Sequence, residues 1–221
     1  MEQLLELDKQ LLLFFNGFHT PFWDNFFYTF SGKIIWLPIA ILISGVIIKT
    51  KRKESFWILL FLITAIVLSD QISTLIKTLV ERLRPTREIT LQGLVQTVNG
   101  YLAGRYGFVS SHASNSFAFA LFSVLLFRHR IYTCTIFVWA TINSYSRMYL
   151  GVHYPGDILG GIILGLSLGG LMFYVMKRFR PQTLIQQQSI HYTKTGFSFI
   201  SMYGIMAGIL LTILAICLTS F

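Results

Sequence analysis

Residues 56–78 read FWILLFLITAIVLSDQISTLIKT, and residues 156–176 read GDILGGIILGLSLGGLMFYVM. Each stretch is apolar over the ~20 residues that an α-helix needs to cross the hydrocarbon core of a bilayer. With four further apolar stretches, the predicted spans cover about 31–48, 56–78, 112–127, 131–149, 156–176 and 199–220. The sequence therefore predicts an all-α integral membrane protein with a six-helix transmembrane bundle.

The composition of the chain agrees with a membrane protein. Of its 221 residues, 54% are hydrophobic and 12% are charged, and the mean hydropathy is +0.63. Soluble domains carry about 25% charged residues on average, and a soluble domain this apolar would lack the polar surface to cover itself. The composition excludes a soluble globular protein, a disordered chain and a disulfide scaffold.

The N-terminal segment differs from the rest of the chain. Residues 1–16 place leucine and phenylalanine at helical spacing with acidic residues between them. Residues 14–30 are rich in aromatic rings, which favour the boundary between lipid headgroups and acyl chains. We expect segment 1–30 to lie at the membrane interface with an N-terminal amphipathic helix, and 31–221 to form the transmembrane domain.

The basic residues sort to one side of the predicted bundle. Three loops on that side hold ten Lys and Arg residues against one acid; they are 49–55, 128–130 and 177–198. Cytoplasmic loops of membrane proteins are rich in Lys and Arg, so we expect these loops in the cytoplasm and both chain termini outside it. The same rule explains the formal net charge of +9 without a nucleic-acid partner.

Polar and charged side chains gather at the opposite, extracytoplasmic ends of the predicted helices. They are Lys77, Arg84, Ser110, Ser111, His112, Arg147, His153 and Asp157. Scattered polar residues would not sort to one side, so we expect these side chains to form one site.

The residue types in this set suit a phosphate group. Lys77, Arg84 and Arg147 can hold phosphate oxygens, and a guanidinium group does so in bidentate fashion. Two predicted helix N-termini add backbone N–H donors. The histidines offer a nucleophile or base and an acid, and a nearby carboxylate can orient one imidazole. The pattern indicates phosphoryl transfer.

Three runs of sequence carry a resemblance to a known family. They are Lys77-TLVERL-Arg84-Pro85, Ser110-Ser111-His112 and Ser146-Arg147-MYLGV-His153-YPG-Asp157. Together they resemble the signature of the type 2 phosphatidic acid phosphatase (PAP2) superfamily, KxxxxxxRP, PSGH and SRxxxxxHxxxD. The first and third parts match at each fixed position, whereas Val109 and Ser111 stand where the second part has Pro and Gly.

The resemblance implies a role for each matching residue. His153 would attack phosphorus and become a phosphohistidine, and Asp157 would orient it. His112 would protonate the leaving group and then help to activate water. The phosphate would be held by Lys77, Arg84, Ser110, Arg147 and the backbone N–H of Ser111. No metal ion and no other cofactor is expected, because three nearby cations repel a metal ion.

Other residues carry weaker expectations. Asp70, inside the second stretch, either pairs with a neighbouring helix or serves the site. Arg82, Arg87 and Arg105 are expected as loop charges near lipid headgroups, with a grip on a second phosphate as the alternative. Surface positions are expected for His19, His129 and His191. A stripe of glycines in the fifth stretch (156, 160, 161, 165, 169 and 170) is interpreted as a helix-packing surface, with a hinge or a lipid groove as alternatives.

The resemblance implies a lipid phosphatase that hydrolyses a lipid (pyro)phosphate at the outer face of the cytoplasmic membrane. Its partners would be the lipid phosphate substrate and membrane lipids, with the oligomeric state left open. Undecaprenyl diphosphate is preferred as the substrate; lipid A phosphate comes next, and phosphatidylglycerol phosphate and phosphatidic acid also fit. A protein of another class, which binds or transports phospholipid without turnover, would need the cations but not the oriented His153 and Asp157.

Overall fold

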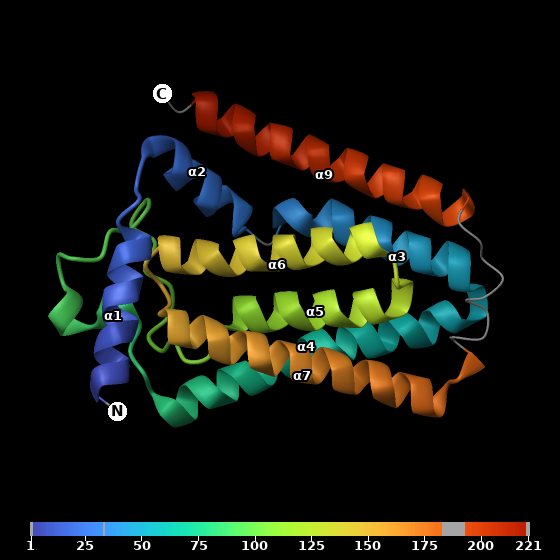
Figure 1. The fold of residues 1–221 in the computed structure, drawn as a ribbon, viewed down its shortest axis with the longest axis horizontal. Helices are drawn as coiled ribbons and strands as arrows, with labels where there is room; N and C mark the ends of the chain where they lie inside the picture. The colour runs from blue at the N-terminus through green and yellow to red at the C-terminus, as the bar shows by residue number, and fades with distance from the viewer. Residues whose placement is uncertain (1, 33, 183–192, 220–221) are drawn as a thin grey trace.

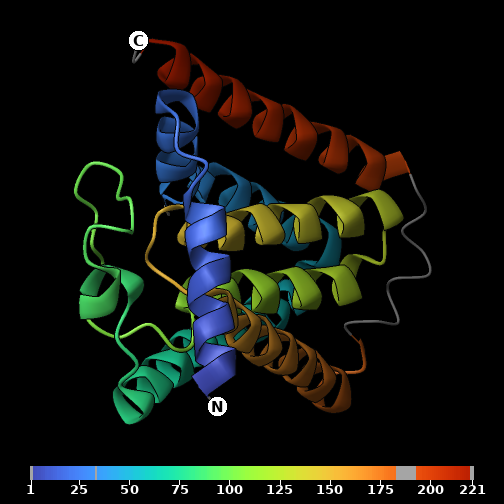
Figure 2. The ribbon, with the colours of Figure 1, turned by 60° about the vertical axis from the view of Figure 1, so that its left-hand side comes forward.

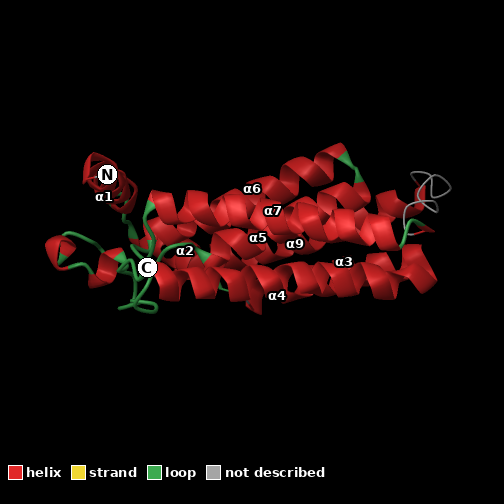
Figure 3. Cartoon of the chain, turned by 90° about the horizontal axis from the view of Figure 1, so that it is seen from below, coloured by secondary structure: helices red, strands yellow, loops and turns green. Residues whose placement is uncertain are grey.

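The computed structural model describes residues 2–32, 34–182 and 193–219, which form a bundle of helices (Figure 1). The helices are α1 (Glu2–Asn16), α2 (Pro21–Phe30), α3 (Leu37–Lys51), α4 (Ser55–Val80), α5 (Ser111–Phe127), α6 (Arg130–Tyr149), α7 (Pro155–Phe179) and α9 (Thr193–Thr219). Short 3-10 turns lie at Ile34–Trp36, Arg52–Glu54, Pro85–Arg87 and Ile89–Leu91. Helices and loops alone make up the described ranges (Figure 3), so the all-α prediction is confirmed.

Each predicted apolar stretch is occupied by a helix. Among the described residues, two continuous helical stretches are long and apolar enough to cross a membrane, Ile34–Val80 and Pro155–Phe179. The first of them contains both α3 and α4. Shorter apolar helical segments are Ser111–Phe127 and Met206–Ala215. The presence of membrane-type helices is thus supported, and six crossings stay a prediction.

Apolar side chains cover the outside of the bundle. Ile41 of α3, Ile63 of α4 and Ile163 of α7 are all more than half exposed, and Ile163 is 67% exposed. Soluble monomers rarely expose large continuous apolar surfaces. Such an exterior suits helices that face lipid.

The packing of α7 on α5 sets the geometry of the bundle. A Cβ added at Gly165 would lie 2.2 Å from the carbonyl oxygen of Ser114, and one at Gly169 would lie 2.5 Å from that of Ala118. Only glycine allows so close an approach of the two backbones. The predicted packing role of the stripe is confirmed at these positions. The contact brings the first turn of α7 next to the first turn of α5.

The N-terminal helix lies across one end of the bundle. Figure 2 shows α1 crossing the ends of α6 and α7, and the loop between α4 and α5 lies at the same end. Leu12 and Asn16 are buried there, and Asn16 Nδ2 donates to the carbonyl oxygen of Tyr149 at 2.7 Å. On its other side Leu4 is 70% exposed. The helix is amphipathic in this sense, and its place at a membrane interface stays a prediction.

Candidate active site

His153 lies in the turn between α6 and α7, at the end of the bundle that α1 crosses. Gly151 allows this turn because it adopts φ +69°, where a side chain would be strained. Pro155 then opens α7 with a preset φ. The His153 side chain is buried, and its Nδ1 lies 3.2 Å from Oδ2 of Asp157, one helical turn onward. The structure therefore places these two residues as a pair.

Hydrogen bonds determine which ring nitrogen of His153 carries the lone pair. Arg84 Nη1 donates to His153 Nε2 at 2.8 Å. A guanidinium group has only donors, so Nε2 accepts, and Nδ1 of the neutral ring carries its proton toward Asp157. Burial lowers the pKa of His153 well below its usual 6.5, and the charges of Arg84, Arg147 and Lys77 lower it further. The arrangement leaves a neutral imidazole with a lone pair on Nε2, as a nucleophile requires.

The two arginines keep unused donors beside this imidazole. Arg84 is 8% exposed and Arg147 is 3% exposed, and the Nε of each is buried without a hydrogen-bond partner among the described residues. Burial and the charge of Arg147 lower the pKa of Arg84 to about 10, so it stays charged at neutral pH. Arg147 Nη2 also donates to the hydroxyl of Tyr101 at 3.0 Å. Buried donors without partners are costly, and an anion would satisfy them.

Lys77, the third cation of the site, has a hydrogen-bond partner at the start of α5. Lys77 Nζ donates to Ser111 Oγ, and this oxygen lies 2.7 Å from Ser73 Oγ. The hydroxyl of Ser111 therefore anchors Lys77, a contact that the family's glycine could not make. Ser110 is the N-cap of α5, and its hydroxyl accepts from the N–H of Ala113 at 3.5 Å. The Ser110 N–H in turn donates to the carbonyl oxygen of Asp157 at 2.9 Å, which joins α5 to α7.

Arg82 is not a loop charge near lipid headgroups, as the sequence had suggested. Its Nη1 donates to Asp157 Oδ1 at 3.0 Å, and its Nη2 donates to Asp8 Oδ2 at 2.6 Å. Neither contact is predicted from the sequence. The contact with Asp157 had one signal in the sequence, because Arg82 lies two residues before Arg84. No local signal points to Asp8, which lies 74 positions away from Arg82.

His19 is not a surface residue either. Its side chain is 9% exposed, and its Nδ1 lies 2.6 Å from Asp24 Oδ1. Tyr149 also donates to this carboxylate oxygen, at 2.7 Å. These contacts hold α2 against the end of α6. His191 falls outside the described residues.

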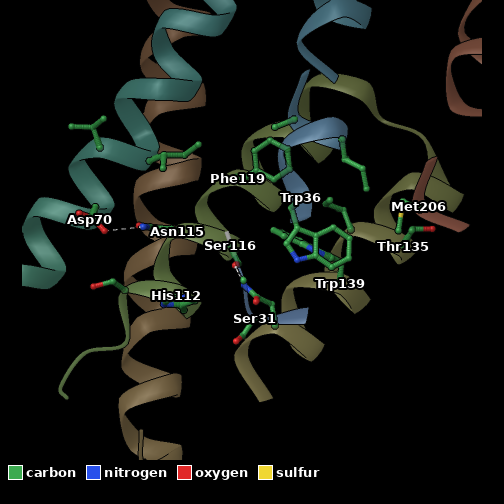
Figure 4. A pocket seen from close by; sticks show the side chains of 18 of the residues that line it. Ser31, Trp36, Asp70, His112, Asn115, Ser116, Phe119, Thr135, Trp139 and Met206 are labelled. Carbon is green, nitrogen blue, oxygen red and sulfur yellow. Dashed lines mark hydrogen bonds between the residues drawn. The ribbon is translucent and has the colours of Figure 1, made fainter. Parts of the chain in front are cut away.

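A cavity of about 550 Å³ lies next to the site. Ser111 and His112 line it at the catalytic end, and the side chain of His112 is drawn among those that line it in Figure 4. Its other lining residues include the rings of Trp36, Phe119 and Trp139, and apolar atoms make up most of its surface. The cavity is therefore mainly apolar, and it adjoins the residues expected to bind phosphate.

Asp70 also lines this cavity. Asn115 Nδ2 of α5 donates to Asp70 Oδ1 at 3.0 Å, as drawn in Figure 4. This contact supports the prediction that Asp70 pairs with a neighbouring helix, rather than the alternative that it serves the site.

Comparisons with known proteins identify the family of the chain. The family model described as "PAP2 superfamily" matches residues 57–181. The lipid A 4'-phosphatase of Bacteroides thetaiotaomicron is 44% identical over 79% of this chain and 78% of its own length. The lipid A 4'-phosphatase of Porphyromonas gingivalis is 36% identical over 83% of this chain and 79% of its own length.

Two solved structures share the fold. Aquifex aeolicus LpxE superposes with a TM-score of 0.61 at 26% identity, covering 76% of this chain and 95% of that one. A transmembrane PAP2 type phosphatidylglycerolphosphate phosphatase from Bacillus subtilis superposes with a TM-score of 0.58 at 21% identity, covering 87% of this chain and 90% of that one. The family model covers more than half of the chain, and its range contains all three signature runs. The chain therefore belongs to the PAP2 superfamily, and it is a phosphatase of the PAP2 type.

Proposed function

We propose that this protein is a lipid phosphatase that works through a phosphohistidine on His153. The observation that carries the proposal is the setting of the His153 imidazole. Its Nδ1 faces Asp157, and its Nε2 faces Arg84, with Arg147 and Lys77 close enough to act on its charge. Phosphate binding alone would need the cations. It would not need a buried imidazole with one nitrogen held by a carboxylate, which counts against a non-catalytic binding or transport role.

The first step transfers the phosphoryl group to the enzyme. Lys77, Arg84 and Arg147 hold the phosphate oxygens, and Arg84 Nη1 turns from His153 Nε2 to one of them. His153 Nε2 attacks phosphorus while the bond to the lipid oxygen breaks, and His112 gives that oxygen a proton. Asp157 accepts the hydrogen bond from Nδ1–H as the ring becomes cationic.

The second step returns the enzyme to its starting state. His112, now neutral, takes a proton from water, and the oxygen of this water attacks the phosphorus of the phosphohistidine. The N–P bond breaks, inorganic phosphate leaves and Nε2 regains its lone pair. The three cations neutralise charge on the phosphoryl oxygens throughout both steps. No step in this scheme requires a metal ion.

The favoured substrate is a lipid A phosphate. Relatives named lipid A 4'-phosphatase match four-fifths of the chain, whereas the undecaprenyl-diphosphatase BcrC of Bacillus subtilis matches 34% of it at 30% identity. Undecaprenyl diphosphate, which was the preferred substrate from the sequence, therefore becomes the second candidate. Lipid A 4'-phosphate is a phosphate monoester on a sugar, so its hydrolysis releases one inorganic phosphate per lipid.

The proposed membrane arrangement follows from the two ends of the bundle. The basic connections between α3 and α4 and between α5 and α6 lie at the end opposite to His153 (Figure 1). With these connections in the cytoplasm, six crossings would place the site at the outer face of the cytoplasmic membrane. Segment 1–30 would then lie at that interface, and residues 31–221 would form the catalytic domain.

The decisive experiment measures phosphate release by the full-length protein in detergent. Wild type and His153→Ala are compared on a lipid A phosphate, undecaprenyl diphosphate, phosphatidylglycerol phosphate and phosphatidic acid, with and without EDTA. We expect release from the lipid A phosphate to be fastest, to be lost in His153→Ala and to survive EDTA. If folded wild-type protein released no phosphate from any of the four lipids, the proposal would be wrong. Arg87→Gln, a change at an exposed loop arginine, is the matched control.

A further inference from the structure

Asp157, whose carboxylate orients His153, is linked through Arg82 to Asp8 of the N-terminal helix α1. Arg82 Nη1 donates to Asp157 Oδ1 at 3.0 Å, and Arg82 Nη2 donates to Asp8 Oδ2 at 2.6 Å. The side chain of Asp157 is 0% exposed, and those of Arg82 and Asp8 are 19% and 13% exposed. We infer that Arg82 and Asp8 are positioning residues of the phosphatase reaction, acting through Asp157.

The two oxygens of Asp157 have different partners. Oδ2 lies 3.2 Å from His153 Nδ1 and accepts from the N–H of Tyr154 at 3.1 Å. Oδ1 is held by Arg82. Because a carboxylate is planar, fixing Oδ1 also fixes the direction in which Oδ2 faces the imidazole. Arg82 in addition supplies the positive charge that a fully buried carboxylate needs.

Asp8 completes the link from α1 to α7. While its Oδ2 holds Arg82, its Oδ1 accepts from the N–H of Gly156 at 2.7 Å. That N–H belongs to the first turn of α7, where a negative charge is favourable. The guanidinium of Arg82 also lies 4.0 Å from the ring centroid of Tyr154. One acidic residue of α1 thus holds both the arginine and the helix that carries Asp157.

Two glycines leave the space that this arrangement occupies. A Cβ added at Gly156 would lie 2.8 Å from Asp8 Oδ2, and one added at Gly107 would lie 2.7 Å from Asp157 Oδ2. Real Cβ atoms do not approach so closely, so a side chain at either position would displace a carboxylate. The carboxylates of Asp8 and Asp157 are therefore closely packed against the backbone of these glycines.

The inference rests on the proposed roles of His153 and Asp157, and it makes a kinetic prediction. Formation of the phosphohistidine puts a positive charge on the imidazole. If the carboxylate of Asp157 were turned away from Nδ1, it would stabilise that charge poorly. The phosphate oxygens are held by other side chains, namely Lys77, Arg84 and Arg147. Loss of Arg82 should therefore lower kcat and leave substrate binding nearly unchanged.

The test compares Arg82→Gln, Arg82→Lys, Asp8→Asn and the double variant of Arg82→Gln with Asp8→Asn in the full-length protein. We expect kcat to fall about 10–100-fold in Arg82→Gln, the size of loss seen when a hydrogen-bond partner that orients a metal-ligating side chain is removed. Arg82→Lys should recover part of the loss, because it keeps the charge. Asp8→Asn should show a smaller loss of kcat. The double variant should be no slower than Arg82→Gln, since Asp8→Asn keeps an oxygen that can accept from the N–H of Gly156 and weakens only the link through Arg82.

Inorganic phosphate serves as the probe that separates positioning from general damage to the site. Its inhibition constant and the KM should stay within about twofold of wild type in Arg82→Gln and Asp8→Asn. Arg87→Gln and Glu6→Gln, which change an exposed arginine of the same loop and an exposed acid of the same helix, should keep wild-type kcat. If Arg82→Gln does not fold, Asp8→Asn carries the test.

Two results would overturn the inference. One is a wild-type kcat in both Arg82→Gln and Asp8→Asn. The other is a loss of phosphate binding as large as the loss of kcat, since that would mean that the whole site had collapsed. Failure of the proposed function would be seen separately, because wild-type protein would then release no phosphate from any lipid.

Discussion

The protonation of His153 is set by its surroundings and can be tested directly. Burial and three neighbouring cations lower its pKa well below 6.5, so the ring is neutral at pH 6.5 and above and becomes protonated only at lower pH. We expect NMR of ¹⁵N-histidine in micelles, assigned with His153→Asn, to give a midpoint below 6.5 without substrate. Arg147→Gln should raise this midpoint, because it removes one of the repelling charges. A midpoint at or above 6.5 in wild type would contradict the assigned surroundings.

The ends of the predicted helices and the family signature together predicted which end of the bundle holds most of the site residues. The predicted set lies at one end of the helices in the structure, from Lys77 in the last turn of α4 to Asp157 in the first turn of α7. The contacts of Asp8 and the hydroxyl contact of Ser111 could not be foreseen. They depend on how α1 crosses the bundle and on which way a serine side chain turns, and neither is encoded in local periodicity.

The interface of α5 and α7 is the packing surface on which the site depends. Gly165→Ala would place a Cβ 2.2 Å from the Ser114 carbonyl oxygen, and the helices would have to separate. Overpacking of this kind costs about 1–3 kcal/mol, so we expect a lower Tm in detergent and a loss of activity. Gly45→Ala on α3 is the matched control, because no atom lies within 4 Å of its added Cβ. Equal Tm values for the two variants would contradict this packing.

The helix boundaries were predicted better than the N-terminal segment. The stretch predicted at 131–149 is α6 (Arg130–Tyr149), and that at 112–127 is α5 (Ser111–Phe127). In contrast, α2 was not predicted as a separate helix. The many aromatic residues of this segment were interpreted only as a preference for the membrane interface. Its signal was present, since Thr20 caps the helix through the N–H of Trp23 and Pro21 opens it.

We expect the lipid tail of the substrate to lie in the cavity beside the site. Ala40 of α3 and Val67 of α4 line it and are exposed, so we expect access to it between these two helices. We expect Ala40→Trp to raise KM for long-tailed lipid phosphates and to spare small soluble phosphate esters. Ile163→Trp, on the exposed side of α7 and away from the cavity, is the control. Equal effects of Ala40→Trp on both substrate types would exclude lateral entry of the tail here.

The proposed orientation of the whole molecule can be tested by labelling single cysteines. In a background of Cys134→Ser and Cys217→Ala, Arg87→Cys lies at the catalytic end and Lys53→Cys at the opposite end. An impermeant maleimide added to spheroplasts should label Arg87→Cys at once and Lys53→Cys only after lysis. The reverse pattern would place the site in the cytoplasm. The sequence predicts this orientation from charge counts alone, because the bundle itself is compatible with either direction.

The order of the site residues along the chain has a consequence for biosynthesis. Every side chain to which a role in the site is given lies between Asp8 and Asp157, and α9 packs against α2 and α3 (Figure 1). At a translation rate of about 5–20 residues per second, all of these groups have left the peptidyl-transferase centre several seconds before the last helix is finished. The nascent chain thus already holds the complete catalytic set while α9 is still being made.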